Sequence, residues 1–416
     1  MEYGLIGKKL THSFSKTIHN MLYNASYELI ELNESELDVF FSKKEFKAIN
    51  VTIPYKSAVI KYLDEISPIA KKIGAVNTIV NKGGRLYGYN TDFYGMRDLL
   101  IKNGISPKGK KCAVLGTGGT SKTAHEVLSS FGAETVLFIS RTKKNGCVDY
   151  ETFKSKHNDT EIIINTTPCG MYPDTFSAPI DLEGFNKLIG VLDVVYNPLR
   201  TNLVIQAQNF KIKAAGGLYM LVSQAIYAAE LFIDKNFEKT VFDDIYKRIL
   251  KSKQNIVLCG MAGCGKTTIG KIISEKLNMD FYDSDELVEK NEKRKISEIF
   301  SKDGESYFRN SESEVIKTLS EKNGSVISVG GGAVMFEKNV LNLKKNGILI
   351  FYERPINDIL PTADRPLSSD RTTLVKLYEK RYPIYKDVSD LYVICDKSAD
   401  IGAQSVIERY FNECDF

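Results

Sequence analysis

Two glycine-rich loops, each placed between a strand-like and a helix-like segment, constrain the fold of this chain more than any other feature. The first occupies residues 114–121 and follows a strand-like segment at 110–115; the second occupies residues 260–267 and follows another at 256–259. A strand, a glycine-rich turn and a helix in this order are typical of parallel sheets covered by helices. Strand-like and helix-like segments alternate along almost the whole chain, so the sequence predicts the α/β class.

Length and composition narrow the class of protein. A chain of 416 residues is too long for one core and predicts two or three domains. Its net charge of +4 gives little reason to expect a nucleic-acid or membrane partner. No apolar run approaches the roughly 18–20 residues of a membrane span, and the start of the chain shows no export signal. The seven cysteines form no C-x-x-C pair. We therefore expect neither zinc nor a disulfide framework, and a cytoplasmic protein.

Two predicted boundaries divide the chain into three domains. The clearer boundary lies near Lys253, where a charged helical stretch ends and the strand before the second loop begins. A less distinct boundary lies at 104–109. We expect a first domain at 1–104, a dinucleotide-binding Rossmann domain from 105 onward, and a P-loop domain with a parallel sheet at 254–416.

The first loop has the features of a dinucleotide site. Gly116 permits a tight turn, Gly118 lets the backbone approach a pyrophosphate, and Ser121 replaces the third glycine of the usual fingerprint. The next strand ends in hydroxyl and basic groups rather than a carboxylate, which favours the 2′-phosphate of NADPH over NAD. A plain glycine turn and a solvated basic turn stay as alternatives. The expected cofactor residues are Gly116, Gly118, Gly119, Thr120, Ser140, Arg141, Thr142 and Lys144.

The second loop is a full Walker A motif. Its backbone N–H groups would bind a β-phosphate, Lys266 would reach the β- and γ-phosphates, and Thr267 would bind Mg²⁺. The motif predicts ATP and Mg²⁺, but it does not identify the acceptor. The expected nucleotide residues are Gly263, Cys264, Gly265, Lys266, Thr267 and Thr268.

Other polar clusters offer groups for an anionic substrate. A lysine near a carboxylate, as in Lys56 and Asp92, is suited to proton transfer, although a surface lysine and a helix cap are the plain alternatives. Asp283 and Asp285 follow a short predicted strand, and we expect the strand pleat to direct one toward the metal and the other toward an acceptor hydroxyl. Several arginines follow the second loop; each alone is most simply a surface charge, but together they favour a carboxylate or phosphate site.

The first 250 residues resemble shikimate dehydrogenase. The resemblance rests on the segments 12–15, 50–56, 74–78, 90–92, 116–119, 165–168, 195–198 and 216–224, which occur in the family's order. It implies that NADPH reduces the ring ketone of 3-dehydroshikimate, with Lys56 and Asp92 as the catalytic pair. It implies Gly217 and Met220 beside the nicotinamide. It also implies a substrate-binding domain at 1–104 together with about 218–250, and an NADP-binding Rossmann domain at 105–217. The implied substrate residues are Ser13, Ser15, Thr52, Asn77, Asp92, Tyr196 and Gln224.

Residues 254–416 resemble shikimate kinase. The resemblance rests on the Walker loop, on Asp283 and Asp285, on the segment 304–312, on three glycines at 330–332 and on the segment 365–367. It implies that Asp285 orients the attacking hydroxyl, that Lys266 and Arg365 offset charge on the transferring phosphoryl group, and that Asp283 helps to position Mg²⁺. The implied shikimate residues are Asp285, Arg309, Gly331, Gly332 and Arg381.

Three positions depart from these family patterns. Lys16 stands where proline is usual, Ser140 where asparagine is usual, and Asp358 where an arginine commonly stacks on adenine. We therefore predict a bifunctional enzyme of the shikimate pathway acting on small molecules. A quinate-directed dehydrogenase joined to another small-molecule kinase, and a non-catalytic metabolite sensor, stay as alternatives. The sequence also leaves a homodimer open.

Overall fold

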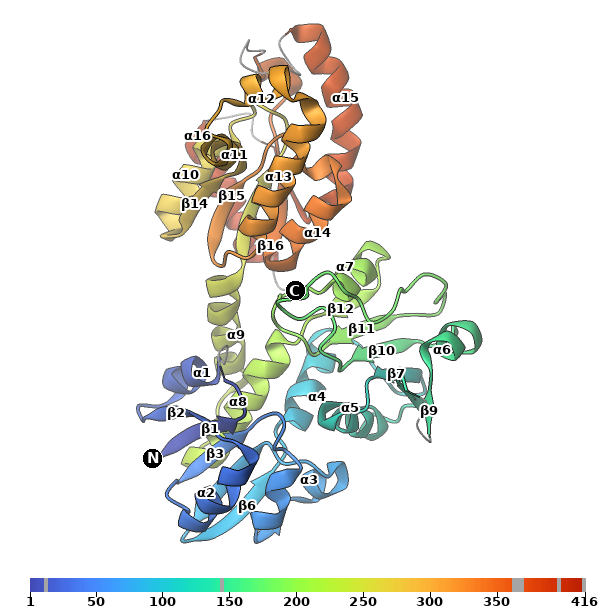
Figure 1. The fold of residues 1–416 in the computed structure, drawn as a ribbon, viewed down its shortest axis with the longest axis vertical. Helices are drawn as coiled ribbons and strands as arrows, with labels where there is room; N and C mark the ends of the chain where they lie inside the picture. Colours follow the sequence, from blue (N-terminus) through green and yellow to red (C-terminus); the bar gives the residue numbers. More distant parts are fainter. Residues whose placement is uncertain (11–13, 143–145, 361–369, 395–397, 414–416) are drawn as a thin grey trace. The chain divides into compact units, whose positions relative to one another are not determined.

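The computed structural model describes residues 1–10, 14–142, 146–360, 370–394 and 398–413. Its contacts divide the chain into two compact units, Met1–Arg248 and Ile249–Phe416. The division falls within helix α9 (Lys239–Lys253) rather than at its end. The finer domain boundaries given above stay a prediction. In Figure 1 the colours run from blue at the start of the first unit to red at the end of the second.

The first sheet is mixed and has the strand order β2-β1-β3-β5-β6-β4. Its central strands β1 and β3 run parallel, whereas β5 runs antiparallel to both β3 and β6. Gly83 and Gly84 form the turn between β5 and β6 with φ values of 60° and 87°, a conformation that favours glycine. The strands are β1 (Tyr3–Gly7), β2 (Tyr27–Glu31), β3 (Ala48–Val51), β4 (Glu65–Ile66), β5 (Thr78–Lys82) and β6 (Arg85–Tyr89).

Helix α8 (Leu218–Ile233) comes late in the first unit but packs on the first sheet. Its residues Ala228 and Phe232 share an apolar core with Tyr3, Leu5 and Val80. The same helix packs against α4 (Asp92–Lys102) and α1 (Ser15–Leu22). The remaining helices near this sheet are α2 (Leu37–Lys43) and α3 (Pro68–Ile73). The first sheet is thus completed by a helix that follows the second sheet in sequence.

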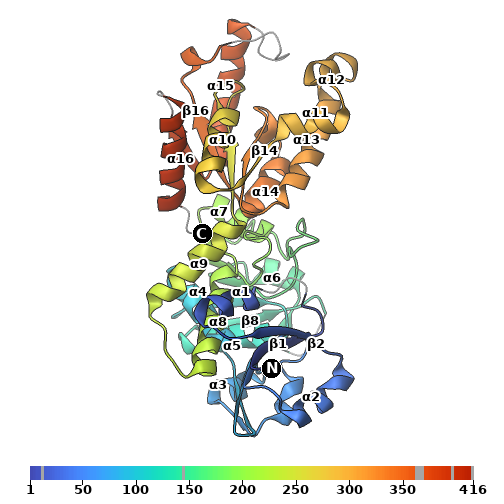
Figure 2. The ribbon, with the colours of Figure 1, turned by 90° about the vertical axis from the view of Figure 1, so that its left-hand side faces the viewer.

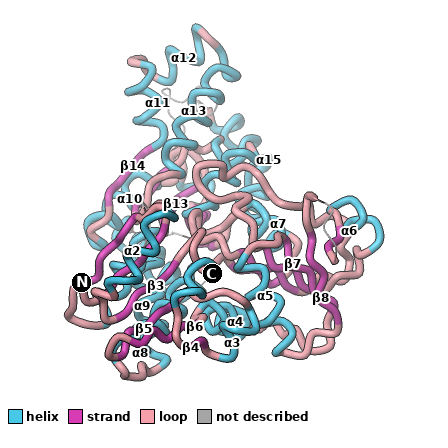
Figure 3. The backbone as a smooth tube through the Cα atoms, turned by 60° about the horizontal axis from the view of Figure 1, so that its bottom comes forward, coloured by secondary structure: helices cyan, strands magenta, loops and turns pink. Residues whose placement is uncertain are grey.

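The second sheet is parallel throughout and has the order β12-β11-β10-β7-β8-β9. The neighbouring strands β7 and β8 lie side by side in Figure 3. Runs of buried apolar residues such as Ile162, Ile163 and Ile164 are expected where helices cover both faces. The elements are β7 (Lys111–Leu115), α5 (Gly119–Ser130), β8 (Thr135–Ile139), β9 (Cys147–Val148), α6 (Tyr150–Lys156), β10 (Ile162–Asn165), β11 (Gly190–Asp193), α7 (Asn202–Asn209) and β12 (Lys213–Ala215).

The second unit contains a five-stranded parallel sheet with the order β14-β15-β13-β16-β17. Helices α10 and α16 pack together, as do α13 and α14 (Figure 2). The strands are β13 (Asn255–Cys259), β14 (Asp280–Asp283), β15 (Ser325–Ser328), β16 (Gly347–Glu353) and β17 (Leu391–Ile394). The helices are α10 (Lys266–Leu277), α11 (Ser284–Glu292), α12 (Ile296–Lys302), α13 (Gly304–Ser320), α14 (Glu337–Asn346), α15 (Arg371–Val388) and α16 (Ala399–Glu413).

The predicted α/β class is confirmed. Both glycine-rich loops follow a central strand and open a helix, α5 for the first and α10 for the second. Among the described residues, no helix combines the length and the apolar character needed to cross a membrane.

Candidate active sites

Lys56 and Asp92 form an ion pair beside the first sheet. The Lys56 Nζ atom lies 2.5 Å from Asp92 Oδ2, and their side chains are 18% and 10% exposed. Asp92 is the first residue of α4, and the Asn90 side chain accepts the backbone N–H of Phe93 in the first turn over 3.1 Å. The Asp92 carboxylate itself accepts a hydrogen bond from the Lys56 ammonium. A shielded ammonium held by a carboxylate can donate a proton to a substrate oxygen.

An amide cluster lies beside this pair. The Asn77 Nδ2 group donates to Thr91 Oγ1 over 3.0 Å and to Gln224 Oε1 over 3.4 Å. Asn77 Oδ1 accepts the backbone N–H of Thr91 over 2.7 Å. Gln224 comes from α8, Asn77 directly precedes β5, and Thr91 directly precedes Asp92. Groups predicted separately from sequence are therefore joined in one network.

Three other predicted substrate residues lie at nearby element ends. Thr52 follows β3 directly, and Ser15 begins α1 and is buried. The Tyr196 ring packs edge-on against Phe14, the residue before α1, with ring centroids 6.2 Å apart. Burial raises the pKa of the Tyr196 hydroxyl, so it stays protonated and can donate. The predicted residue Ser13 lies outside the described residues.

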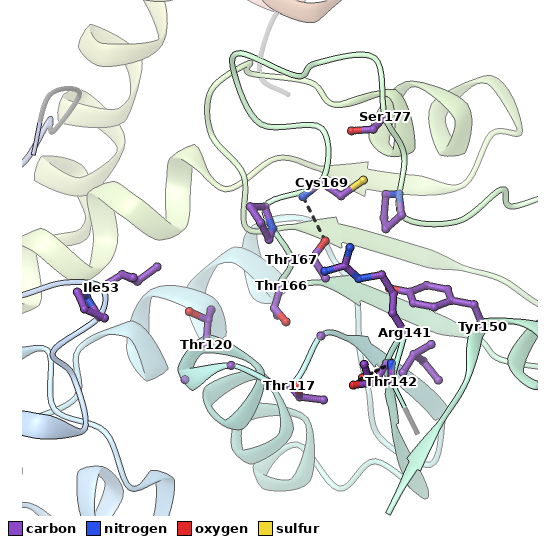
Figure 4. Close-up of a pocket in the computed structure, with 18 of the residues that line it drawn as sticks. Ile53, Thr117, Thr120, Arg141, Thr142, Tyr150, Thr166, Thr167, Cys169 and Ser177 are labelled. Atoms are coloured by element: carbon purple, nitrogen blue, oxygen red, sulfur yellow. Dashed lines mark hydrogen bonds between the residues drawn. The ribbon is translucent and has the colours of Figure 1, made fainter. Parts of the chain in front are cut away.

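A cavity of about 970 Å³ opens between the loop after β3 and the first glycine-rich loop. Figure 4 shows Ile53 at one side, Arg141 and Tyr150 at the opposite side, and Thr117 and Thr120 between them. Predicted residues that line it are Lys56, Gly116, Gly118, Gly119, Thr120, Ser140, Arg141 and Thr142. The sequence interpretation did not assign the other lining residues Ile53, Pro54, Ser57, Thr117, Ile139, Tyr150, Thr166, Thr167, Pro168, Cys169, Asp174, Ser177, Ala178 and Pro179.

The glycines of this cavity fit a dinucleotide. Gly116 has φ of 109°, and a Cβ atom there would meet Thr166 Oγ1 at 3.0 Å. Gly118 and Gly119 have no atom within 4 Å of an added Cβ, so a ligand can reach their backbone. Because α5 begins at Gly119, the free N–H groups of its first turn can bind an anion. The loop therefore suits a pyrophosphate.

The basic end of the cavity fits a phosphate on the ribose. The Ser140 hydroxyl accepts the Thr142 backbone N–H over 3.3 Å, which shapes the turn after β8. Arg141 is exposed. Burial raises the pKa of the Tyr150 hydroxyl, and the positive charge of Arg141 opposes this effect. Lys144 lies outside the described residues. An exposed guanidinium with neighbouring hydroxyls is suited to a 2′-phosphate.

Thr166 is a cavity residue that the sequence interpretation missed. Its hydroxyl donates to Leu115 O over 2.6 Å and lies 2.7 Å from Ser121 Oγ. Thr166 directly follows β10, the strand next to β7, and ligands of parallel sheets bind where such strand ends meet. Thr166 could not be placed beside the first glycine-rich loop from the sequence, because this requires knowing that β10 pairs with β7.

Two predicted nicotinamide residues are absent from the cavity lining within the described part of the chain. Met220 is buried on α8. A Cβ atom at Gly217 would lie 2.2 Å from Val194 O, so close backbone packing by itself requires glycine there. The role of both residues at the cofactor stays a prediction.

The second glycine-rich loop positions Lys266 at its centre. The buried Lys266 Nζ group donates to the carbonyl oxygens of Gly260 and Met261, each over 2.9 Å. Gly263 and Gly265 have φ of 83° and 100°, which favour glycine. Cys264 is buried in the loop, whereas Thr268 is exposed on α10. These bonds hold the Lys266 ammonium at the loop, where it can reach the phosphate oxygens of a nucleotide.

Asp283 and Thr267 form the candidate metal end of this site. The Thr267 hydroxyl donates to Asp283 Oδ2 over 2.7 Å, and hydroxyl and carboxylate oxygens suit Mg²⁺. The predicted separation of Asp283 and Asp285 by a strand pleat is wrong. Strand β14 ends at Asp283, whose side chain caps α11, so Asp285 already lies in the helix. The two carboxylates therefore belong to the N-cap and the second residue of one helix.

An acidic and basic cluster surrounds the glycines at 330–332. An added Cβ at Gly330 would lie 2.5 Å from Asp285 Oδ1, and one at Gly332 would lie 2.4 Å from Arg309 Nη2. Arg381 Nη1 lies 3.4 Å from the corresponding position at Gly331. Glycine at these positions thus lets the charged side chains lie directly against the backbone. Arg365, which the sequence places at this site, lies outside the described residues.

Two carboxylates in this cluster have unusual pKa values. Burial, followed by the charges of Asp283 and Glu312, raises the pKa of Asp285 to about 7. Burial also raises the pKa of Glu312, although Arg309 opposes this effect with an Nη1 to Oε2 distance of 2.7 Å. A carboxyl group with a pKa near neutrality is suited to accept a proton from an acceptor hydroxyl. The site residues Glu312 and Gly330 were not assigned from the sequence.

Together, the geometry defines a class of protein: a dinucleotide-dependent oxidoreductase site in one unit and a P-loop phosphotransferase site in the other. The family profile for the shikimate dehydrogenase substrate binding domain matches residues 5–79, and the profile for shikimate kinase matches residues 262–414. The NADP(+) shikimate dehydrogenase of Clostridium beijerinckii is 38% identical over 259 residues, covering 59% of this chain and 96% of that protein. The chain therefore belongs to the shikimate dehydrogenase family, and it also carries a shikimate kinase domain.

Solved structures agree with this assignment. A chorismate mutase/shikimate 5-dehydrogenase fusion protein from Clostridium acetobutylicum is 34% identical, with a TM-score of 0.56, covering 59% of this chain and 96% of that one. The shikimate 5-dehydrogenase of Thermus thermophilus, in complex with NADP(H) and shikimate, is 28% identical with a TM-score of 0.54. That match covers 60% of this chain and 99% of the Thermus chain.

Proposed function

We propose that the first unit reduces 3-dehydroshikimate to shikimate with NADPH and that the second unit phosphorylates shikimate with MgATP to give shikimate 3-phosphate. The observation that carries the proposal is the shielded Lys56–Asp92 pair, whose lysine lines the dinucleotide cavity. Relatives named as NADP(+) shikimate dehydrogenases support the cofactor and the substrate class. The free state of Cys112, Cys147, Cys169, Cys259 and Cys264 supports a reducing compartment such as the cytoplasm.

In the first reaction, the residues of the chain bind the acid and supply a proton. Bound NADPH would supply the hydride to the ring carbonyl carbon. The Lys56 ammonium then donates a proton to the carbonyl oxygen as it becomes a hydroxyl, and the neighbouring Asp92 carboxylate holds that ammonium in place. Asn77 and Gln224 offer amide groups to the ring hydroxyls. Arg141 and the hydroxyls around it would hold the 2′-phosphate.

In the second reaction, Asp285 accepts the proton of the attacking hydroxyl. A new bond forms between that oxygen and the γ-phosphorus, while the bond to the β,γ-bridging oxygen breaks and ADP leaves. Lys266 offsets the charge on the transferring group, and Thr267 with Asp283 would hold Mg²⁺. Arg309 and Arg381 lie beside the glycines at 330–332, where they can pair with the substrate carboxylate.

A coupled assay on the intact chain tests the proposal. The protein receives dehydroshikimate, NADPH, ATP and Mg²⁺, and we expect oxidation of NADPH together with formation of shikimate 3-phosphate. Quinate with NAD serves as the competing substrate pair for the first unit. Higher catalytic efficiency with quinate and NAD would refute the dehydroshikimate assignment, and absence of both activities would favour a metabolite sensor.

A further inference from the structure

His19 is a fully buried imidazole in the middle of α1, and both of its ring nitrogens have polar partners. Its Nε2 atom lies 3.1 Å from Asn50 Oδ1, and its Nδ1 atom lies 2.8 Å from the Tyr23 hydroxyl. The ring stacks between Tyr27 and Phe232, with centroid distances of 4.2 Å and 5.4 Å. The proposed reductase chemistry does not use this histidine.

The hydrogen bonds define which His19 nitrogen carries the proton. The Tyr27 hydroxyl donates to Asn50 Oδ1 over 2.8 Å, so this oxygen acts as an acceptor. His19 Nε2 must therefore donate to it, and Nδ1 accepts the proton of the Tyr23 hydroxyl. Burial lowers the pKa of His19 to about 3, so the ring stays neutral at physiological pH. The imidazole is a fixed donor rather than a titrating group.

This donor sets the orientation of the Asn50 amide. With Oδ1 directed at His19 and Tyr27, the Asn50 Nδ2 group donates to Asn77 O and to Thr78 Oγ1, each over 3.3 Å. Rotating the amide by half a turn would place its N–H groups against two other donors. His19 and Tyr27 together therefore exclude the alternative orientation.

The chain of bonds continues to the predicted substrate residues. Thr78 Oγ1 donates to Asn77 Oδ1 over 3.1 Å, and Asn77 Nδ2 reaches Gln224. On its other side, His19 lies on the helix that begins with Ser15, and Asn50 lies on the strand that precedes Thr52. One imidazole thus connects three segments that carry substrate groups. Loss of its Nε2–H bond would loosen all three, whereas Ser15, Thr52 and Asn77 are not among the residues that line the cofactor cavity.

We propose that His19 is a positioning residue for the acid substrate of the reductase site, because its Nε2–H group fixes the Asn50 amide and thereby the segments of Ser15, Thr52 and Asn77. The inference rests on the proposed reductase function. A positioning role differs from a purely structural role in one measurable respect. Loss of the His19 hydrogen bond should weaken binding of the acid substrate and leave binding of the dinucleotide unchanged.

Two variants of the intact chain test the proposal. His19→Phe keeps the ring stacking between Tyr27 and Phe232 but removes both polar contacts. His19→Gln keeps an amide N–H group that can reach Asn50 Oδ1. We expect the KM for dehydroshikimate to rise about tenfold in His19→Phe and to return to within about threefold of the wild-type value in His19→Gln. The KM for NADPH and the kinase activity of the same molecules should stay at wild-type values.

Three results would contradict the proposed role of His19. An unchanged dehydroshikimate KM in His19→Phe, an equal rise in both KM values, or no recovery in His19→Gln would overturn the proposal. If His19→Phe lacks a folded first unit, seen as loss of NADP-dependent thermal stabilisation, Asn50→Ser provides the test. It removes the amide through which the His19 Nε2–H group would act, and an unchanged dehydroshikimate KM there overturns the proposal. A wild-type protein without reductase activity would instead refute the proposed function itself.

Discussion

At the residue scale, each of the two proposed reactions depends on a different lysine. Lys56 is paired with the Asp92 carboxylate, whereas Lys266 is held by two loop carbonyls in the other unit. Lys56→Ala should lower the reductase kcat by about 10²–10⁴-fold, because it removes the proton donor, and leave the kinase unchanged. Lys266→Ala should have the opposite selectivity. Both activities are measured on each variant, and loss of both from either change would contradict independent sites.

The unusual pKa of Asp285 makes a prediction about pH. The carboxyl group is neutral below its pKa of about 7 and can accept a proton only above it. The kinase kcat/KM should therefore fall about tenfold per pH unit below 7 and reach a plateau above it.

The control for this profile is Asp285→Asn, which should lower the kinase rate strongly and remove the inflection near neutrality. A wild-type kinase profile that stays flat between pH 5 and 8 would show that Asp285 does not act as the base. The reductase activity of Asp285→Asn should match that of the wild type at every pH.

At the element scale, the close contact of α4 and α8 connects the catalytic pair to the substrate amide. A Cβ atom at Gly95 on α4 would lie 2.6 Å from Met220 O and 3.0 Å from Gln224 Cβ on α8. Gly95→Ala should therefore push the helices apart, destabilise the first unit by about 1–3 kcal/mol and raise the KM for dehydroshikimate. Denaturant unfolding and reductase kinetics measure the two effects.

The matched control is Ile101→Ala on the same helix, where the side chain is 60% exposed. It should change stability by no more than about 0.5 kcal/mol. Equal effects of the two substitutions would show that the close contact of α4 and α8 at Gly95 does not control stability or substrate binding.

Elements were predictable where local chemistry determines them. Glycines before a helix, as at Gly116 and Gly265, identified both loops, and apolar runs identified their strands. The antiparallel β5–β6 pair was not predicted, because strand direction depends on which partner a strand finds. Likewise, the network of His19 with Asn50 and the proximity of Thr166 to Ser121 join residues far apart in sequence. Their residue types alone gave no signal for these contacts.

At the scale of the whole molecule, we expect each compact unit to have its own thermal unfolding transition, which rises only with the ligand of that unit. NADP should raise only the thermal transition of Met1–Arg248, and ADP with Mg²⁺ only that of Ile249–Phe416. A ligand at 100 times its Kd adds about 2.7 kcal/mol to the unit that binds it. Calorimetry of the intact chain measures both transitions, and Lys266→Ala should remove only the ADP effect. One transition that responds equally to both ligands would contradict the prediction.

The helical connection between the units has a consequence for the cell. Helix α9 ends at Lys253 and β13 begins at Asn255, with the buried residue Gln254 between them. The boundary between Arg248 and Ile249 falls inside α9, so the backbone that joins the units is helical rather than extended. Both sites belong to one polypeptide, so the two enzymes are synthesised as one molecule. Their copy numbers stay equal, so the ratio of the two fluxes depends on catalytic constants and metabolite levels rather than on separate control of protein abundance.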